Sequence, residues 1–222
     1  MSDILQAVTW LFVLALGVTF CVFVRNLGLR VTYVRDILHI STGIWVFGWK
    51  YWHNPAFPSV ITVLAFALIF ILPKIKVRAL KRFIESVSDE DETWNGIVLY
   101  VFSFMVFTIV GFCWDTFSAG ASLLCLSFGD GIGGSTGRLF GRRFYALPWG
   151  KKKSLEGSIA VFASSVFAIL ISAEYFDVEI ALALPVLTAL IVSIAEALSP
   201  KALDNLFVPV FAYLFLAWGG RI

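Results

Sequence analysis

The sequence predicts an all-α membrane protein with about eight transmembrane helices. Of its 222 residues, 59% are hydrophobic and 14% are charged, whereas about 25% are charged in a typical soluble domain. The mean hydropathy is +0.89. A soluble domain of this length could not bury so much apolar surface in its core. The apolar residues gather in segments long enough to cross a bilayer, and the cations lie between them. Because no linker rich in Pro, Gly or Ser divides these segments, we expect one membrane domain over residues 1–222.

Each expected span is an apolar run close to the roughly 17 to 25 residues that a transmembrane helix needs. In chain order the runs are 5–24, 36–52, 58–73, 97–114, 116–138, 158–175, 178–198 and 206–220. The first run could be a signal peptide, but it lacks a basic leading region and a small-residue cleavage site, which favours a span. The sixth and seventh are short enough to be tilted, re-entrant or differently divided.

The basic residues orient these spans, because cytoplasmic loops retain Lys and Arg. Of the 17 Lys and Arg residues, only Lys50 and Arg221 lie on one side. The others follow the first, third, fifth and seventh spans: Arg25, Arg30 and Arg35; Lys74, Lys76, Arg78, Lys81 and Arg82; Arg138, Arg142, Arg143, Lys151, Lys152 and Lys153; and Lys201. We therefore expect both termini outside and the basic loops in the cytoplasm. The net charge of +2 is small, so the expected partner is the lipid bilayer and not a nucleic acid.

The densest polar stretch runs from Ser127 to Ser158, and two familiar nucleotide motifs can be excluded there. Gly129, Gly131 and Gly134 satisfy GxGxxG, but a dinucleotide fingerprint needs a preceding strand in a βαβ unit. An apolar helix precedes these glycines instead. A phosphate-binding GxxxxGK[ST] loop also fails, because a serine stands at the lysine position.

Helix packing accounts for part of this stretch but not for its acidic residue. Gly133, Gly137 and Gly141 recur every four residues, a pattern that allows membrane helices to approach closely. Asp130 lies at the end of a membrane span, where a carboxylate is costly and is by default a functional candidate. Beside glycines and cations it could hold Mg²⁺ near a bound phosphate. The alternatives are a salt bridge to Arg138 or a helix cap.

The run Lys151, Lys152 and Lys153 precedes a predicted helix start. An isolated run of this kind is usually a positive-inside anchor. Here Ser154 can cap the following helix, so cations and unpaired backbone amides would face the same anion. Glu156 in the first turn either complements the helix dipole or supplies a second metal ligand.

The segment EALSPKALDNLFVP returns further acidic residues to the same side of the membrane. It places Glu196 in the seventh span and Asp204 and Asn205 in the following cytoplasmic turn. Asp204 could be a helix cap and Glu196 a buried neutral acid, but a site shared with Asp130 is the more economical interpretation. His39 returns to this side as well and is a candidate for catalysis, with packing as its alternative.

The four segments RDILHISTG, GDGIGGSTGRLFG, KKKSLEGSIAVF and EALSPKALDNLFVP together resemble the CTP-dependent polyprenol kinase family. This family comprises phytol, farnesol, geranylgeraniol and dolichol kinases and the related yeast-type diacylglycerol kinase. The resemblance covers most of the chain and extends to the order and spacing of the segments. Two departures are Asp36 after Arg35, where the family often has a basic pair, and Gly133 and Gly134 in place of small alanines. The long N-terminal helices of eukaryotic dolichol kinases are absent, which favours a compact kinase of the phytol or geranylgeraniol type.

The resemblance implies nucleotide and Mg²⁺ functions for Asp130, Lys153, Ser154, Glu156, Gly157, Ser158, Glu196, Asp204 and Asn205, without assigning each a role. Together with the residues considered above, it gives the expected site. The expected catalytic residues are Asp130, Glu196, Asp204 and His39, and the expected Mg²⁺ ligands are Asp130, Glu156 and Asp204. The expected nucleotide-binding residues are Gly129, Gly131, Gly134, Lys151, Lys152, Lys153, Ser154, Glu156, Gly157, Ser158 and Asn205.

The activity that the resemblance implies is transfer of the γ-phosphoryl group of CTP to the hydroxyl of an isoprenoid alcohol, with Mg²⁺ as cofactor. The related cytidylyltransferases, in which a lipid phosphate attacks the α-phosphate of CTP, are the first alternative. Their long C-terminal signature with an extra Asp pair is not visible here. A non-catalytic lipid transporter is the second alternative, and it would leave the coincidence of the motifs unexplained.

Overall fold

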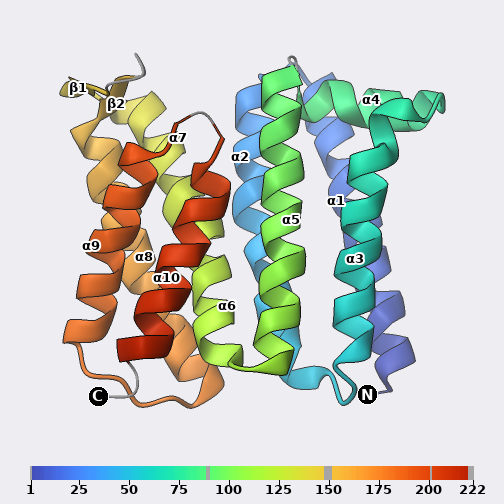
Figure 1. The fold of residues 1–222 in the computed structure, drawn as a ribbon. Helices are drawn as coiled ribbons and strands as arrows, with labels where there is room; N and C mark the ends of the chain where they lie inside the picture. The colour runs from blue at the N-terminus through green and yellow to red at the C-terminus, as the bar shows by residue number, and fades with distance from the viewer. Residues whose placement is uncertain (1, 89–90, 148–151, 201, 220–222) are drawn as a thin grey trace.

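The computed structural model describes residues 2–88, 91–147, 152–200 and 202–219, and helices make up nearly all of them (Figure 1). The helical elements are α1 (Asp3–Asn26), α2 (Val31–Ser41), the 3₁₀ helix η1 (Thr42–Tyr51), α3 (Ala56–Ile71), the 3₁₀ turn η2 (Leu72–Lys74), α4 (Arg78–Val87), α5 (Asp91–Cys113), α6 (Thr116–Leu124), the π-helical segment η3 (Cys125–Asp130), α7 (Gly131–Phe140), α8 (Leu155–Phe176), α9 (Ala183–Leu198) and α10 (Asp204–Gly219). The predicted all-α class is confirmed for the described residues. The sequence did not predict one small addition, the antiparallel pair β1 (Phe144–Ala146) and β2 (Lys152–Ser154).

Within the described residues, four helices are long and apolar enough to cross a membrane: α1, α3 continued by η2, α5 from Trp94, and α8. The other four expected spans take different forms. Residues 36–52 are the end of α2 followed by η1, and residues 116–138 combine α6, η3 and most of α7. The helices α9 and α10 have 16 residues each. Length and composition therefore establish four candidate spans, and the count of eight is not established.

The seventh expected span begins later than predicted. Asp177 ends α8 in a left-handed conformation with φ 55°, and the amide of Val178 donates back to the carbonyl of Ala173. This is a typical helix C-terminus, in which the returning amide satisfies a carbonyl of the last turn. The chain consequently leaves α8 in a loop, and α9 starts at Ala183 instead of residue 178.

The helices form two groups with α2 and α5 between them (Figure 1). One group contains α6 to α10, and α1 and α3 lie on the other side. The amphipathic helix α4 lies across the end of the molecule that also carries β1 and β2. Its residues Arg78, Lys81 and Arg82 are exposed, whereas Phe83 and Val87 are buried. The start of α1 and the end of α10 lie at the opposite end (Figure 1).

Glycines bring α7 and α8 into close contact, as the four-residue repeat predicted. A Cβ atom on Gly133 would overlap Val161 and lie 3.2 Å from the carbonyl oxygen of Gly157. A Cβ atom on Gly137 would lie 2.9 Å from Ser154 Oγ. The close approach matters for function, because it fixes the start of α8 against the segment that carries Asp130.

Candidate functional site

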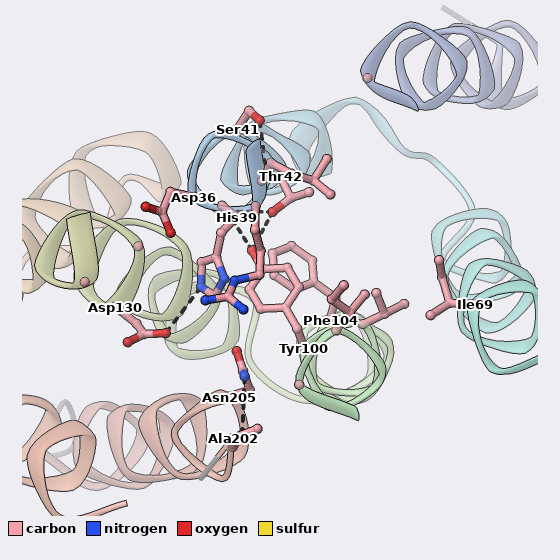
Figure 2. Close-up of a pocket in the computed structure, with 18 of the residues that line it drawn as sticks. Asp36, His39, Ser41, Thr42, Ile69, Tyr100, Phe104, Asp130, Ala202 and Asn205 are labelled. Atoms are coloured by element: carbon pink, nitrogen blue, oxygen red, sulfur yellow. Dashed lines mark hydrogen bonds and ion pairs between the residues drawn. The ribbon is translucent and has the colours of Figure 1, made fainter. Parts of the chain in front are cut away.

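A cavity of about 1290 Å³ lies between the helices, and it combines a polar end with an apolar arm. The polar end is lined by Asp130, Lys153, Glu196 and Asp204, together with His39. The arm is lined by apolar side chains of α1, α3 and α5. In Figure 2, Asp130 and His39 point toward one another, and Phe104 and Ile69 lie on the far side of His39 from Asp130. The cavity is larger than the roughly 300 to 1,000 Å³ of a pocket for one drug-sized ligand, which suits two substrates.

Three carboxylates converge at the polar end. Asp130 closes the π-helical segment η3, Glu196 lies in the last turn of α9, and Asp204 opens α10. One carboxylate oxygen of each lies within 4.8 Å of the others. Single π-helical turns are rare within helices and occur often at functional sites. The three carboxylates that we expected to share a site thus lie close together, and their role stays a prediction.

Neither structural alternative for Asp130 describes its surroundings. Asp130 occupies the N-cap position of α7, yet within the described residues its side chain forms no cap hydrogen bond. Arg138, the expected salt-bridge partner, instead pairs with Asp36, which also accepts a hydrogen bond of 3.0 Å from Ser135 Oγ. Asp36 thus ties α2 to α7, which gives a structural role to the acidic residue that follows Arg35.

Lys153 brings a positive charge into the acidic cluster. Its Nζ donates to the main-chain oxygen of Glu196 at 2.6 Å and forms an ion pair with the Glu196 carboxylate. Burial alone would lower the pKa of the Lys153 ammonium, but the charges of Glu196, Asp130 and Asp204 outweigh burial and raise this pKa above its ordinary value. The hairpin supplies the position, since Lys153 lies in β2 opposite Tyr145 of β1.

Ser154 caps α8, as predicted: its Oγ accepts a hydrogen bond of 3.1 Å from the amide of Gly157. Ser154, Gly157 and Ser158 all line the cavity. Ser158 Oγ also lies 2.7 Å from Tyr145 Oη, a contact that links the first turn of α8 to the hairpin. The start of α8 thus faces the polar end together with Lys153, an arrangement that favours anion binding.

Glu156 lies apart from the converging carboxylates. Its carboxylate accepts hydrogen bonds from the backbone amides of Arg142 and Arg143 at 3.1 and 3.3 Å. Among the described residues, Glu196 is the glutamate that stands beside Asp130 and Asp204. The structure therefore gives Glu156 a role in fixing the chain before the hairpin, and it offers no support for the metal role that we expected.

His39 contacts both the acidic cluster and the π-helical segment. Its Nε2 lies 3.0 Å from the carbonyl oxygen of Leu126 and 3.6 Å from Asp130 Oδ2. A carbonyl oxygen can only accept, so we assign the ring hydrogen to Nε2. Its one hydrogen is donated to the Leu126 carbonyl, which fixes the ring beside Asp130, and the 3.6 Å separation from Asp130 Oδ2 is longer than a hydrogen bond.

Tyr100 is a site residue that the sequence reasoning missed. Its hydroxyl donates to the carbonyl oxygen of His39 at 2.8 Å and lies 2.9 Å from Ser127 Oγ. The Tyr100 and His39 rings have centroids 4.1 Å apart, and Tyr100 lines the cavity where the polar end meets the arm (Figure 2). The only available signal was a hydroxyl within an apolar span.

The remaining expected residues divide between the cavity and its surroundings. Gly131, Gly134, Lys152 and Asn205 line the cavity. Gly129 is not among the described residues that line it: a Cβ atom there would lie 2.5 Å from Ser165 Oγ, which indicates packing against α8. Lys151 lies outside the described residues.

Comparison with known proteins gives one informative match. A curated protein of wheat, Triticum aestivum, named probable phytol kinase, chloroplastic, is 27% identical to this chain over 208 residues. The match covers 83% of this chain and 67% of the wheat protein. No protein-family model matches the chain, and no solved structure does.

Proposed function

We propose that this phytol kinase-like membrane protein transfers the γ-phosphoryl group of CTP to the hydroxyl of an isoprenoid alcohol. The chain is a distant homologue of a member of the CTP-dependent polyprenol kinase family. One observation carries the proposal: an acidic cluster with a buried lysine lies at the polar end of a cavity whose other arm is apolar. A nucleotide fits the first part and a lipid tail the second.

We propose Mg²⁺ as the cofactor, because the carboxylates suit its coordination. Mg²⁺ binds oxygen at about 2.0 to 2.1 Å in octahedral geometry, so opposite ligand oxygens lie about 4.2 Å apart. The carboxylate oxygens, within 4.8 Å of one another, need only small shifts to share an ion. Since Lys153 engages Glu196, we assign the ion to Asp130 and Asp204. Asp130 and Asp204 would hold the ion, which would supply positive charge against the bound triphosphate.

The chain's own residues would do the rest of the work. Lys153 and the first turn of α8 would bind the triphosphate, as cations and helix amides do in other phosphate sites. His39, held by its hydrogen bond to the Leu126 carbonyl, would pack beside Asp130. A carboxylate of the acidic cluster would accept the proton of the alcohol, because His39 Nε2 already carries a hydrogen.

We also propose eight crossings, with the site facing the cytoplasm and both termini outside. Helix α1 begins, and helix α10 ends, at the end of the molecule opposite the hairpin and α4 (Figure 1). Most of its cations lie at the hairpin end, as the positive-inside rule requires of a cytoplasmic face.

The test is the nucleotide product. Purified protein in detergent is given Mg²⁺, each of four nucleoside triphosphates, and phytol, geranylgeraniol, a long polyprenol or diacylglycerol. Release of CDP with a phosphorylated alcohol would support the kinase. Release of pyrophosphate with a lipid phosphate as acceptor would indicate a cytidylyltransferase, and consumption of no nucleotide would overturn both.

A further inference from the structure

The apolar arm of the cavity ends at two tryptophans. Trp10 of α1 and Trp45 of η1 both line the arm, and their rings meet edge to face with centroids 4.9 Å apart. Both side chains are buried. Trp45 Nε1 donates to Thr108 Oγ1 at 3.0 Å, which fixes the orientation of its ring.

Several contacts hold this tryptophan pair in place. Gly48 has no side chain, and a Cβ atom there would lie 2.5 Å from Trp10 Cζ2, so the Trp10 ring lies directly on the η1 backbone. Gln6 Nε2 donates to the Gly48 carbonyl at 3.4 Å. The Asp3 carboxylate accepts the backbone amides of His53 and Asn54 at 2.9 and 3.1 Å. The lower part of α1 is thereby bound to η1 and to the loop after it.

The depth of the arm follows from helix geometry. Trp45 comes six residues after His39, first along α2 and then along η1. With rises of about 1.5 Å per residue in an α-helix and 2.0 Å in a 3₁₀ helix, Trp45 lies about 10 Å farther along the axis than His39. A lipid whose hydroxyl is at the acidic cluster would therefore meet the tryptophan pair after a short length of tail.

We infer that Trp10 and Trp45 limit the tail length of the lipid acceptor, so that alcohols of a few isoprene units are preferred over long polyprenols. The inference rests on the proposed function, because it takes the hydroxyl to lie at the acidic cluster. The tail of such an alcohol would lie between α1, α3 and α5.

Gly17 allows the inference to be tested without disturbing the fold. It lines the arm on α1, seven residues after Trp10, which is almost two helical turns and therefore the same face. A Cβ atom on Gly17 would meet no heavy atom within 4 Å. A larger side chain at this position would occupy the arm instead of displacing protein atoms, and it would remove a glycine from a helix interior.

The experiment compares wild type, Gly17→Leu, Trp10→Ala and a control in detergent, with CTP and a series of geraniol, farnesol, geranylgeraniol and a long polyprenol. Gly17 lies about 10 Å from Trp10 along α1 toward the hairpin end, level with His39, so Gly17→Leu should lower kcat/KM by about tenfold for every alcohol of the series, as expected when methylene-sized groups compete for a pocket. Trp10→Ala should raise kcat/KM for the long polyprenol, relative to that for geranylgeraniol, by about tenfold. The KM for CTP should stay constant in both.

Trp114→Ala is the matched control, because this tryptophan is 76% exposed and is not among the residues that line the arm. It should keep the wild-type preference. If Gly17→Leu leaves kcat/KM unchanged for every alcohol, the tail lies elsewhere and the inference is overturned; this variant gives the answer even if Trp10→Ala fails to fold.

A second measurement separates this inference from the proposed function. Thermal stabilisation by the same alcohols, recorded without nucleotide, reports tail binding alone. Stabilisation that depends on tail length in wild type and is weakened for every alcohol in Gly17→Leu would support the tail limit. That support would stand even if no alcohol were phosphorylated, an outcome that would overturn only the kinase. Stabilisation independent of tail length would overturn the tail limit itself.

Discussion

Replacing Asp130 with asparagine should remove the stabilisation of the protein by Mg²⁺ and, without Mg²⁺, leave the variant at least as stable as wild type. Asn keeps the size of the side chain and removes its charge. In wild type without metal, the Asp130 carboxylate lies within 4.8 Å of the carboxylates of Glu196 and Asp204. Such a cluster is electrostatically unfavourable until a cation binds.

The size of the effect follows from these distances. Two unit charges 4.8 Å apart repel by about 3.5 kcal/mol at an effective dielectric constant of about 20. Asp130 has two such neighbours, while Lys153 and Arg35 attract it more weakly. A buried carboxylate among like charges also takes up a proton and so does not bear the full repulsion. We therefore expect a net gain on the order of 1 kcal/mol without metal, or a rise in Tm of about 2 to 4 °C for a chain of this size. Wild type should gain about 2.7 kcal/mol from Mg²⁺ at a hundred times its Kd.

The assay is thermal unfolding of both proteins in detergent, with EDTA and with increasing Mg²⁺, alongside turnover. Asp177→Asn is the control, because this carboxylate is 81% exposed and pairs with Lys50 away from the cluster; it should respond to Mg²⁺ as wild type does. Turnover of Asp130→Asn should fall by orders of magnitude. The reasoning is refuted if Mg²⁺ raises the Tm of Asp130→Asn as much as that of wild type, or if its turnover is near normal.

Three further predictions concern the cations, the topology and the helix contact. In a steady-state assay, Lys153→Ala should raise the KM for CTP or lower kcat by about 10- to 150-fold, because it removes a charge-assisted contact with phosphate. Lys152→Ala should change either constant by only a few-fold in the same assay. A cysteine replacing Phe144, which is 60% exposed, should react with an impermeant label only from the cytoplasm, and native Cys113 only from outside; labelling of both from one side would contradict the eight-span topology. Gly133→Val should lower stability by about 1 to 3 kcal/mol through overlap with α8, measured as a lower Tm, and an unchanged Tm would contradict the close packing.

Local properties of the chain were readable from the sequence. Apolar runs predicted the helices because a bilayer imposes length and hydropathy on any segment that crosses it. Polar residues in apolar surroundings, such as Asp130 and Glu196, were visible as site candidates because burying a charge without a function is costly. Ser154 was readable as a helix cap because capping is decided within a few residues.

The identity of the partners was decided by tertiary structure. Lys153 meets Glu196 across 43 positions of sequence, and Tyr100 meets the His39 carbonyl across 61. The sequence offered Glu156 and Glu196 as acidic residues of the site, and only the packing of α9 against the neighbouring helices showed which of them stands beside Asp130. Gly129 fitted a nucleotide motif in the sequence, but its contact with Ser165 belongs to packing.

The apolar arm could not be read from the sequence at all. Its wall is built from α1, α3 and α5, whose lining residues are indistinguishable in sequence from those that face lipid. In a membrane both surroundings are apolar, so hydropathy separates helix from loop but does not separate a cavity from the bilayer. Composition and short-range pattern thus determined that the chain has membrane helices and where its charged groups lie. Only the docking of distant helices determined which groups meet and what space they enclose.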